Sequence, residues 1–342
     1  MLCKLDVEKA YDHVNWGFLM YMPQRCTFSE KWRKWIVCCI STVKFSILIN
    51  GSPSDFFGSS REIRQGDPFS LLIFDVVMEA LSHMLEVAAT AGRFSRFCVH
   101  NTAGTSMMVF HLLFADDTLI FCYANANHLV TLREILTRFE GVSGLRINLG
   151  KSKLVPVGDV HNLDDLVGLL GCRHSSLPLK YLGLPFPLGA KFKELSIENP
   201  TLEKMEWRLV GWKRLFLSKG GKVTLIKSTL SSLPTYFLSI LPIPEKVGNR
   251  TKKLQRDFLW SGISGDPKLH LGKWAKICRL VQVGGLGIRR LRSFNSALLG
   301  KWLWRYGIVT DALWRKVIEA RYGNVWGGWC TKKVTSAYGV SL

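Results

Sequence analysis

Two adjacent carboxylates stand between two apolar runs and form the strongest chemical signal in the chain. Asp116 and Asp117 lie within Phe114–Thr118, and the residues on both sides indicate strands. Carboxylates at the tip of a mostly buried hairpin repel each other, and their charge is costly to bury unless something neutralises it. A divalent cation would do so, because hard cations prefer carboxylate oxygen. An ordinary Asp-Asp surface turn is the simpler interpretation of this motif taken alone.

A third carboxylate, Asp6, lies about 110 residues earlier, near the end of an apolar strand. A carboxylate at a strand end can point into a cleft, although an Asp just ahead of a helix also serves as an ordinary N-cap. Taken together, the two carboxylate sites could share two magnesium ions, which is the arrangement that in-line phosphoryl transfer uses.

A cation, an amide and a glycine precede a predicted long helix at Arg64-Gln65-Gly66, which Asp67-Pro68 follows. Glycine at such a position lets the backbone approach a ligand closely. A capped helix start, with Asp67 or Ser70 as the cap, explains the same residues without a ligand.

The elements that must position these residues alternate between two periodicities. The pattern predicts strands over residues 2–7, 44–50, 55–57, 107–114 and 118–123. It predicts helices over residues 8–20, 31–40, 70–89 and 129–139. This order is typical of an α+β layer, in which helices cover one face of an antiparallel sheet. Beyond residue 184 the pattern changes to long helical stretches broken by Pro and Gly, so we expect a domain boundary near 184–200 and a mainly α-helical second half.

The composition points to a polyanionic partner. The 342 residues include 46 Lys and Arg against 26 Asp and Glu, a net charge of +20, and 47% of the residues are apolar. The apolar content excludes a disordered or collagen-like chain. A pI of about 9.7 favours nucleic acid ahead of an anionic membrane as the partner.

The positive charge is confined to the second half. Residues 1–170 hold 16 Lys and Arg against 17 Asp and Glu, whereas residues 171–342 hold 30 against 9. Such a region is either a well-solvated helical surface or a surface that follows a phosphate backbone and stacks on bases. The basic and aromatic residues of interest are Trp212, Lys213, Arg214, Lys219, Lys222, Lys227, Lys252, Lys253, Arg256, Arg289, Arg290 and Arg292.

Cysteine usage and hydropathy exclude several classes of protein. The nine cysteines are odd in number and show no CxxC spacing, so we expect no disulfide framework, no disulfide-linked partner and no zinc site. Four of the first ten residues are charged, which argues against a signal peptide. One long uncharged apolar stretch, Ser228–Pro244, has 17 residues and three prolines. A membrane span needs about 20 apolar residues, so we expect no transmembrane segment and a cytoplasmic or nuclear location.

Five segments, in order, resemble the motifs of the reverse transcriptase domain of non-LTR (LINE-type) retrotransposons, especially the plant forms. They are KLDVEKAYDHVNW for motif A, RQGDPFS for motif B, FADD for motif C, SGLRINLGKSK for motif D and KYLGLPF for motif E. The similarity continues through GWKRLFLSKGGKVTLIKSTLSSLPTYF and LQRDFLW, and so covers essentially the whole chain.

The resemblance implies a right-hand polymerase palm over residues 1–185 and a basic, Trp-rich, mainly helical thumb-like and downstream region over 186–342. The implied activity is RNA-directed DNA synthesis, by two-metal transfer of a nucleotide from a dNTP to a primer 3′-hydroxyl. The implied cofactor is a pair of Mg²⁺ ions, with Mn²⁺ as an alternative. The implied partners are an RNA template, a DNA primer and dNTPs, without a membrane.

The resemblance also assigns roles by position. Asp6, Asp116 and Asp117 match the metal-binding carboxylates, which are the three residues that the chemistry alone selects. Lys151 matches the motif D lysine that would protonate or stabilise the leaving pyrophosphate, and Lys153 is equally suited on chemistry.

Further residues match the nucleotide and primer contacts of the family. Tyr11 matches the aromatic residue beneath the sugar, whose bulk would exclude a 2′-hydroxyl, although a core aromatic on an amphipathic helix is the simpler role. The matches to nucleotide-binding positions are Val7, Tyr11, Arg64, Gln65 and Gly66. The matches to the primer-grip turn are Tyr181, Leu182 and Gly183, which also fit a plain hairpin turn.

The sequence departs from the family pattern at several points. It starts just ahead of motif A, where the family has a fingers subdomain and often an endonuclease domain, so we expect an N-terminally truncated form. Glu62 and Asp55 stand where glycine is usual, and Leu71 stands where proline is usual. We therefore expect nucleic-acid binding with weak or no polymerisation, and an inactive element remnant that only binds nucleic acid is the alternative.

Overall fold

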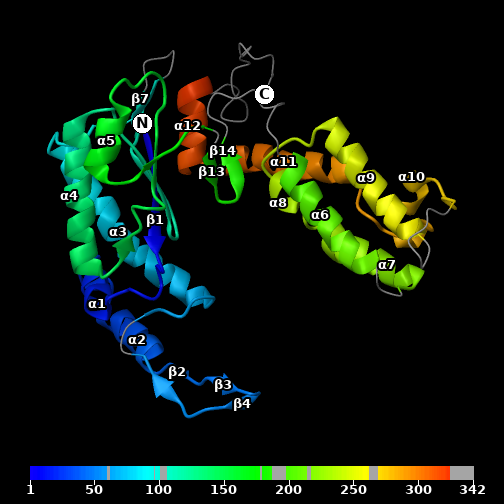
Figure 1. Cartoon of the computed structure of the whole chain (residues 1–342), viewed down its shortest axis with the longest axis horizontal. Helices are drawn as coiled ribbons and strands as arrows, with labels where there is room; N and C mark the ends of the chain where they lie inside the picture. The colour runs from blue at the N-terminus through cyan, green and yellow to red at the C-terminus, as the bar shows by residue number, and fades with distance from the viewer. Residues whose placement is uncertain are drawn as a thin grey trace. The chain divides into compact units, whose positions relative to one another are not determined.

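The computed structural model describes residues 1–59, 62–95, 97–100, 106–177, 179–186, 198–213, 217–261 and 269–323. The described residues divide into two units, the first comprising Met1–His100 and Ser106–Leu182, and the second beginning at Gly183 (Figure 1). Each unit has its own buried core.

Strand β1 (Leu2–Glu8) is the centre of the main sheet of the first unit. The strand order is β12-β11-β1-β9-β8, and β10 pairs with the end of β1. The other strands are β8 (His111–Phe114), β9 (Asp117–Phe121), β10 (Arg146–Ile147), β11 (Lys153–Val155) and β12 (Arg173–His174). All pairs are antiparallel except β11–β12, which is parallel. The sheet is therefore mixed, whereas the sequence pattern predicts an antiparallel one, and the β11–β12 pair is the difference.

Side chains along β1 alternate between a buried and a polar face. Cys3, Leu5 and Val7 are buried, while Lys4 and Asp6 are partly exposed. This period of two follows from the strand geometry, in which successive side chains point to opposite faces. One face of the sheet is therefore available for a core and the other for polar chemistry.

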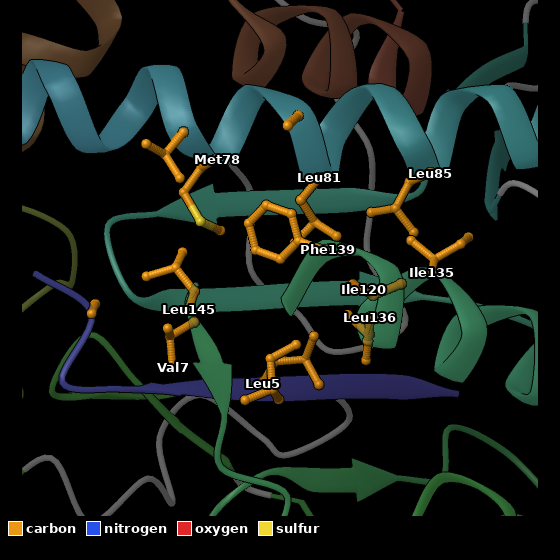
Figure 2. Close-up of a cluster of buried hydrophobic side chains, with 14 of the residues drawn as sticks. Leu5, Val7, Met78, Leu81, Leu85, Ile120, Ile135, Leu136, Phe139 and Leu145 are labelled. Atoms are coloured by element: carbon orange, nitrogen blue, oxygen red, sulfur yellow. The ribbon is translucent and has the colours of Figure 1, made fainter. Parts of the chain in front are cut away.

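Helices α3 (Pro68–Thr90) and α4 (Ala126–Ser143) cover the buried face. Figure 2 shows their apolar side chains turned toward Leu5 and Val7 of β1 and Ile120 of β9. The remaining helices of this unit are α1 (Trp16–Arg25), α2 (Glu30–Ser41) and α5 (Leu163–Leu170). The predicted helices over 31–40, 70–89 and 129–139 are all present, but α5 has no counterpart among the predicted elements.

The helix predicted over residues 8–20 is wrong in its first half. Lys9 has φ of 42°, and α1 begins only after Asn15. The Asn15 side chain accepts hydrogen bonds from the N–H groups of Gly17 and Phe18, as an N-cap does. The Asn15 N–H donates to Ser143 O at 2.9 Å, so a tertiary contact also holds the cap in place. Residues 9–13 therefore form turns between β1 and the helix.

Short two-stranded ladders make up the other described strands, and β14 of the last ladder belongs to the second unit. The hairpin predicted over residues 44–57 consists of two separate ladders, β2 with β5 and β3 with β4, which extend beyond α2 (Figure 1). These strands and the remaining pairs are β2 (Lys44–Phe45), β3 (Leu48–Ile49), β4 (Ser52–Pro53), β5 (Phe57–Gly58), β6 (Phe97–His100) with β7 (Ser106–Val109), and β13 (Leu179–Tyr181) with β14 (Leu184–Phe186).

The described residues of the second unit beyond β14 are helices and the turns that connect them. They are α6 (Glu198–Lys213), α7 (Lys219–Leu225), a π-helical turn (Ile226–Leu230), α8 (Thr235–Leu238), α9 (Glu245–Trp260), α10 (Trp274–Ile277), a 3-10 turn (Val281–Val283), α11 (Leu291–Ile308) and α12 (Leu313–Tyr322). The buried core includes Met205, Ile226 and Phe258 from α6, the π-helical turn and α9.

Two negative findings apply to the described part of the chain. None of its helices combines the length and the apolar character that a membrane crossing needs. Its eight cysteines are all free, and Cys330 lies outside the described residues.

Candidate active site

Asp6 and Asp117 occupy directly opposite positions on β1 and β9. The main-chain groups of Asp6 both face the other edge of β1, where Asn148 N–H donates to Asp6 O and Asp6 N–H donates to the Ser152 hydroxyl. Because both groups face away from β9, Asp6 and Asp117 form a non-hydrogen-bonded pair, the kind in which side chains approach most closely, with Cα atoms about 4.5 Å apart. The register thus places two carboxylates side by side on the polar face.

Asp116 lies in the two-residue turn between β8 and β9 and is exposed. The preceding Ala115 has φ of 49°, a left-handed conformation that is unfavourable for a residue with a Cβ. Burial, followed by the negative charges of Asp116 and Asp75, raises the pKa of Tyr11 above its ordinary value. Asp116 therefore lies near enough to Tyr11 for its negative charge to disfavour the phenolate form of Tyr11.

Tyr11 is half-buried in the turn after β1. Its ring contacts Phe74 of α3, with the ring centroids 5.1 Å apart. Its carbonyl accepts a hydrogen bond from Ile63 N–H at 2.9 Å, which places the segment that leads into motif B beside Tyr11. The structure thus brings the turn after β1 next to the start of α3.

The segment ahead of α3 combines a helix cap with exposed polar groups. Asp67 Oδ1 accepts a hydrogen bond from Phe69 N–H at 2.9 Å, so Asp67 is the N-cap. Gly66 has φ of 90°, which only glycine adopts without strain. Arg64 and Gln65 are exposed, and their predicted nucleotide contacts remain a prediction.

A tight turn at Asn148–Ser152 holds the main chain of Asp6. The buried Ser152 hydroxyl accepts from Asp6 N–H at 3.1 Å and donates to Asn148 O at 2.8 Å. Asn148 Oδ1 accepts from Lys151 N–H at 3.0 Å. Lys151 is exposed at the tip of this turn, and Lys153 lies on β11 opposite Lys4. The predicted motif D segment is therefore pinned to the strand that carries Asp6.

Lys4 also belongs to this face, although no motif in the sequence points to a role for it. Its Nζ lies 2.8 Å from Asp117 Oδ1 and 3.4 Å from Lys180 O. Tyr181 follows in the same strand, β13, and its ring centroid is 5.9 Å from Lys4 Nζ. Lys4 precedes Asp6 by two residues, so the period of a strand would have placed it on the same face.

The predicted primer-grip residues form the turn of a hairpin. Leu182 and Gly183 have φ of 49° and 75°, and they join β13 to β14. Positive φ at both central residues is the signature of a type I′ turn, which matches the twist of paired strands. The simpler interpretation, a plain hairpin turn, describes this geometry, and the primer contact stays a prediction.

The carboxylates supply suitable donor chemistry for a divalent cation, because Mg²⁺ and Mn²⁺ both accept hard oxygen ligands. Among the described residues, however, no group of three or more His, Cys, Asp and Glu side chains is already arranged to hold a metal ion. The Lys4 ammonium group is paired with one of the oxygens that such an ion would need. The site therefore fits a cation by its donors, and Lys4 competes with such a cation for Asp117 Oδ1.

Several basic residues of the second unit have structural roles. Lys222 is buried, and its Nζ donates to Ser261 O and Oγ at 2.9 Å. Lys219 Nζ donates to Leu259 O at 3.0 Å, so both lysines cap the end of α9. Trp212 contacts Phe258 in the core. Lys222 is therefore committed to the fold, whereas Lys219 is exposed and Trp212 is partly exposed, so their predicted nucleic-acid contacts remain predictions.

Other residues of that group are on the surface. Arg292 contacts Glu245 at 2.9 Å, and Arg290 donates to Ala275 O at 2.9 Å. The exposed members of this basic group are Lys227, Lys252, Lys253, Arg289, Arg290 and Arg292. Arg214 lies outside the described residues.

Comparison with known proteins agrees with the motif pattern. Residues 1–186 match the family described as reverse transcriptase (RNA-dependent DNA polymerase), a match over more than half of the chain. A putative ribonuclease H protein of Arabidopsis thaliana is 39% identical over 121 residues, 35% of this chain and 20% of that protein. The uncharacterized 149 kDa protein of transposon TX1 from Xenopus laevis is 25% identical over 311 residues, 86% of this chain and 22% of that protein.

A shorter relative, an uncharacterized mitochondrial protein of Arabidopsis thaliana, is 42% identical over 71 residues, 21% of this chain and 56% of that protein. The chain spans about a fifth of the length of the ribonuclease H-named and transposon TX1 relatives. The five motifs found in the sequence all fall within the matched residues. The chain belongs to the reverse transcriptase family of RNA-dependent DNA polymerases.

Proposed function

We propose that this chain carries the RNA-directed DNA polymerase core of a non-LTR retrotransposon, with a palm over residues 1–185 and a thumb-like region beyond it. The observation that carries the proposal is the register of β1 and β9, which sets Asp6 beside Asp117, with Asp116 in the adjoining turn near Tyr11. The similarity to a transposon protein along 86% of this chain supports an origin in a mobile element.

In the proposed reaction, Asp6, Asp116 and Asp117 would hold two divalent cations. Such ions, when bound, activate an attacking hydroxyl and stabilise charge on the leaving group of an in-line displacement. Tyr11 presents its ring beneath the sugar of the incoming nucleotide and excludes a 2′-hydroxyl by bulk. Lys151, held by the turn at Asn148, protonates or stabilises the departing pyrophosphate.

The proposed template and primer contacts follow from charge. The exposed lysines and arginines of the second unit provide a surface for phosphate groups, which bind largely without regard to sequence. Arg64, Gln65 and the main chain at Gly66 contact the incoming nucleotide and template base, and the Tyr181–Gly183 turn holds the primer end.

The test is primer extension on an RNA template with Mg²⁺. The full chain is compared with Asp116→Asn/Asp117→Asn and with Asp159→Asn/Asp164→Asn, a matched loss of two exposed carboxylates outside the site. We expect the first variant to lose incorporation and the second to keep it. Equal incorporation by all three proteins would contradict the assignment of the carboxylates.

A second candidate function is nucleic-acid binding without polymerisation. It is favoured by Glu62, which combines a charge beside motif B with a left-handed φ of 86°, where the family has glycine. In that case no protein incorporates nucleotides, while the unmodified chain and both variants bind an RNA–DNA duplex with the same steep salt dependence.

A further inference from the structure

One lysine joins the carboxylate face to the β13–β14 hairpin. Lys4 Nζ is 2.8 Å from Asp117 Oδ1, 3.4 Å from Lys180 O and 5.9 Å from the Tyr181 ring centroid. The side chains of Lys4 and Asp117 are 22% and 25% exposed, so the ion pair is partly shielded from water. An ammonium group has three donors, which lets one lysine serve both partners at once.

The position of the ammonium group conflicts with a metal ion on the same carboxylate. Two cations on one oxygen repel each other, and the repulsion grows where water is partly excluded. A divalent cation on Asp117 Oδ1 therefore displaces the Lys4 ammonium group, and one on the second oxygen, Oδ2, is still repelled by it. The Lys180 carbonyl and the Tyr181 ring are already within reach of the released ammonium.

We propose that Lys4 is a positioning residue that acts as the chain's own counter-ion for Asp117, yields this carboxylate to a divalent cation, and keeps its contacts to Lys180 and Tyr181. The inference rests on the proposed function of the aspartates as a metal site. It means that occupation of the carboxylates and placement of the 179–182 segment depend on one side chain.

The chain offers a control for charge alone. Lys153 lies directly opposite Lys4 on β11, on the same face, and is exposed. Removing it changes the net charge of this face by the same amount, while leaving the ion pair between Lys4 and Asp117 in place. A contact-dependent effect and a general charge effect can thus be separated.

The first experiment is titration of the full chain with Mn²⁺, with free ion measured by electron paramagnetic resonance. We expect Lys4→Gln to bind Mn²⁺ about two- to fivefold more tightly, the size expected for loss of a partly exposed ion pair. The increase in Mn²⁺ affinity for Lys153→Gln should be less than half as large, and the affinity of Lys4→Arg should stay near that of the unmodified chain. Adding Asp117→Asn to Lys4→Gln should abolish the increase. A fold defect would instead weaken binding.

The second experiment measures hydrogen exchange of the amides at residues 179–182. Lys4→Gln should exchange several-fold faster there than the unmodified chain or Lys153→Gln, with and without Mn²⁺. Equal Mn²⁺ affinities for Lys4→Gln and the unmodified chain, or equal gains for both glutamine variants, would overturn the role of Lys4 alone. Absence of any Asp117-dependent Mn²⁺ binding in the unmodified chain would overturn the proposed metal site together with this inference.

Discussion

Asp6 is held through its main chain, which leaves its carboxylate free to act. Both its N–H and its carbonyl form hydrogen bonds with the turn at Asn148–Ser152. The Ser152 side chain, whose hydroxyl accepts the hydrogen bond from Asp6 N–H, is fully buried. A buried donor without a partner costs about 1–3 kcal/mol, so this hydroxyl stabilises one backbone geometry at Asp6. Under the proposed function, residues that position the Asp6 carboxylate influence the rate through small displacements.

Ser152→Ala should lower the rate of nucleotide addition by about tenfold or more, because Asp6 N–H loses its acceptor and the strand shifts. It should also reduce the free energy of unfolding by about 1–3 kcal/mol. Single-turnover extension and urea denaturation measure the two effects.

Ser143→Ala is the matched control, since Ser143 is equally buried and bonded to Phe139 O and Leu145 N–H. It should lose comparable stability and retain the rate. Equal rate losses in Ser143→Ala and Ser152→Ala would refute a positioning role, whereas Ser152→Thr should restore the rate.

Glu62→Gly should increase the free energy of unfolding by about 0.5–1 kcal/mol, because φ of 86° strains a residue with a Cβ and glycine relieves it. Urea denaturation at neutral pH measures the change. Asp159→Gly, at an exposed loop residue without positive φ, should instead be neutral or destabilising. A loss of stability in Glu62→Gly would show that the left-handed backbone there is not strained.

At the level of elements, the end of helix α4 packs on the turn that follows β1. Helices α4 and α5 both end at a glycine with φ of 79°, Gly144 and Gly171. A Cβ on Gly144 would lie 2.6 Å from His13 O, in the turn that follows β1. The end of α4 therefore packs directly on the turn that contains Tyr11.

Gly144→Ala should cost about 3 kcal/mol or more, since backbone strain is combined with a clash against a main-chain oxygen. Gly171→Ala is the matched variant, because its nearest neighbour is Leu149 Cδ1 at 3.6 Å. It should cost only about 1 kcal/mol. Urea denaturation of both variants tests the difference, and equal losses would argue against close packing of α4 on the turn.

At the level of the whole molecule, charge separates the two halves of the chain. The reverse transcriptase family match falls on the nearly neutral half, and the excess of Lys and Arg falls on the other. Not every cation of the second half is available to bind phosphate groups. Lys222 and Lys219 cap α9, and Arg292 contacts Glu245. The surface cations Lys252 and Lys253 are better candidates for phosphate contacts.

Lys252→Gln/Lys253→Gln should flatten the dependence of log binding constant on log salt by up to about two units, with stability changed by less than about 0.5 kcal/mol. Lys222→Met should leave the salt slope unchanged and lower stability by about 1–3 kcal/mol, since it removes donors from Ser261. Fluorescence anisotropy of an RNA–DNA duplex and urea denaturation measure the two quantities. A flatter salt dependence for Lys222→Met, or an unchanged one for Lys252→Gln/Lys253→Gln, would contradict phosphate binding by Lys252 and Lys253.

Local patterns in the sequence are sufficient to identify the motif residues, the uneven charge distribution and the helices over 31–40, 70–89 and 129–139. Hydrophobic periodicity, caps and turn residues act over a few positions, so they can be recognised without knowing the fold. The helix predicted over 8–20 is wrong because a left-handed Lys9 and the tertiary contact of Asn15 delay its start.

Only the tertiary structure decided the neighbours of the carboxylates. The register of β1 against β9 sets Asp6 opposite Asp117, and the turn at Asn148–Ser152 reaches Asp6 across about 146 residues of sequence. The same holds for the ion pair of Lys4 and for the burial of Lys222. Chemical type can be recognised from one residue, whereas register and burial depend on how distant segments pack to remove apolar surface from water.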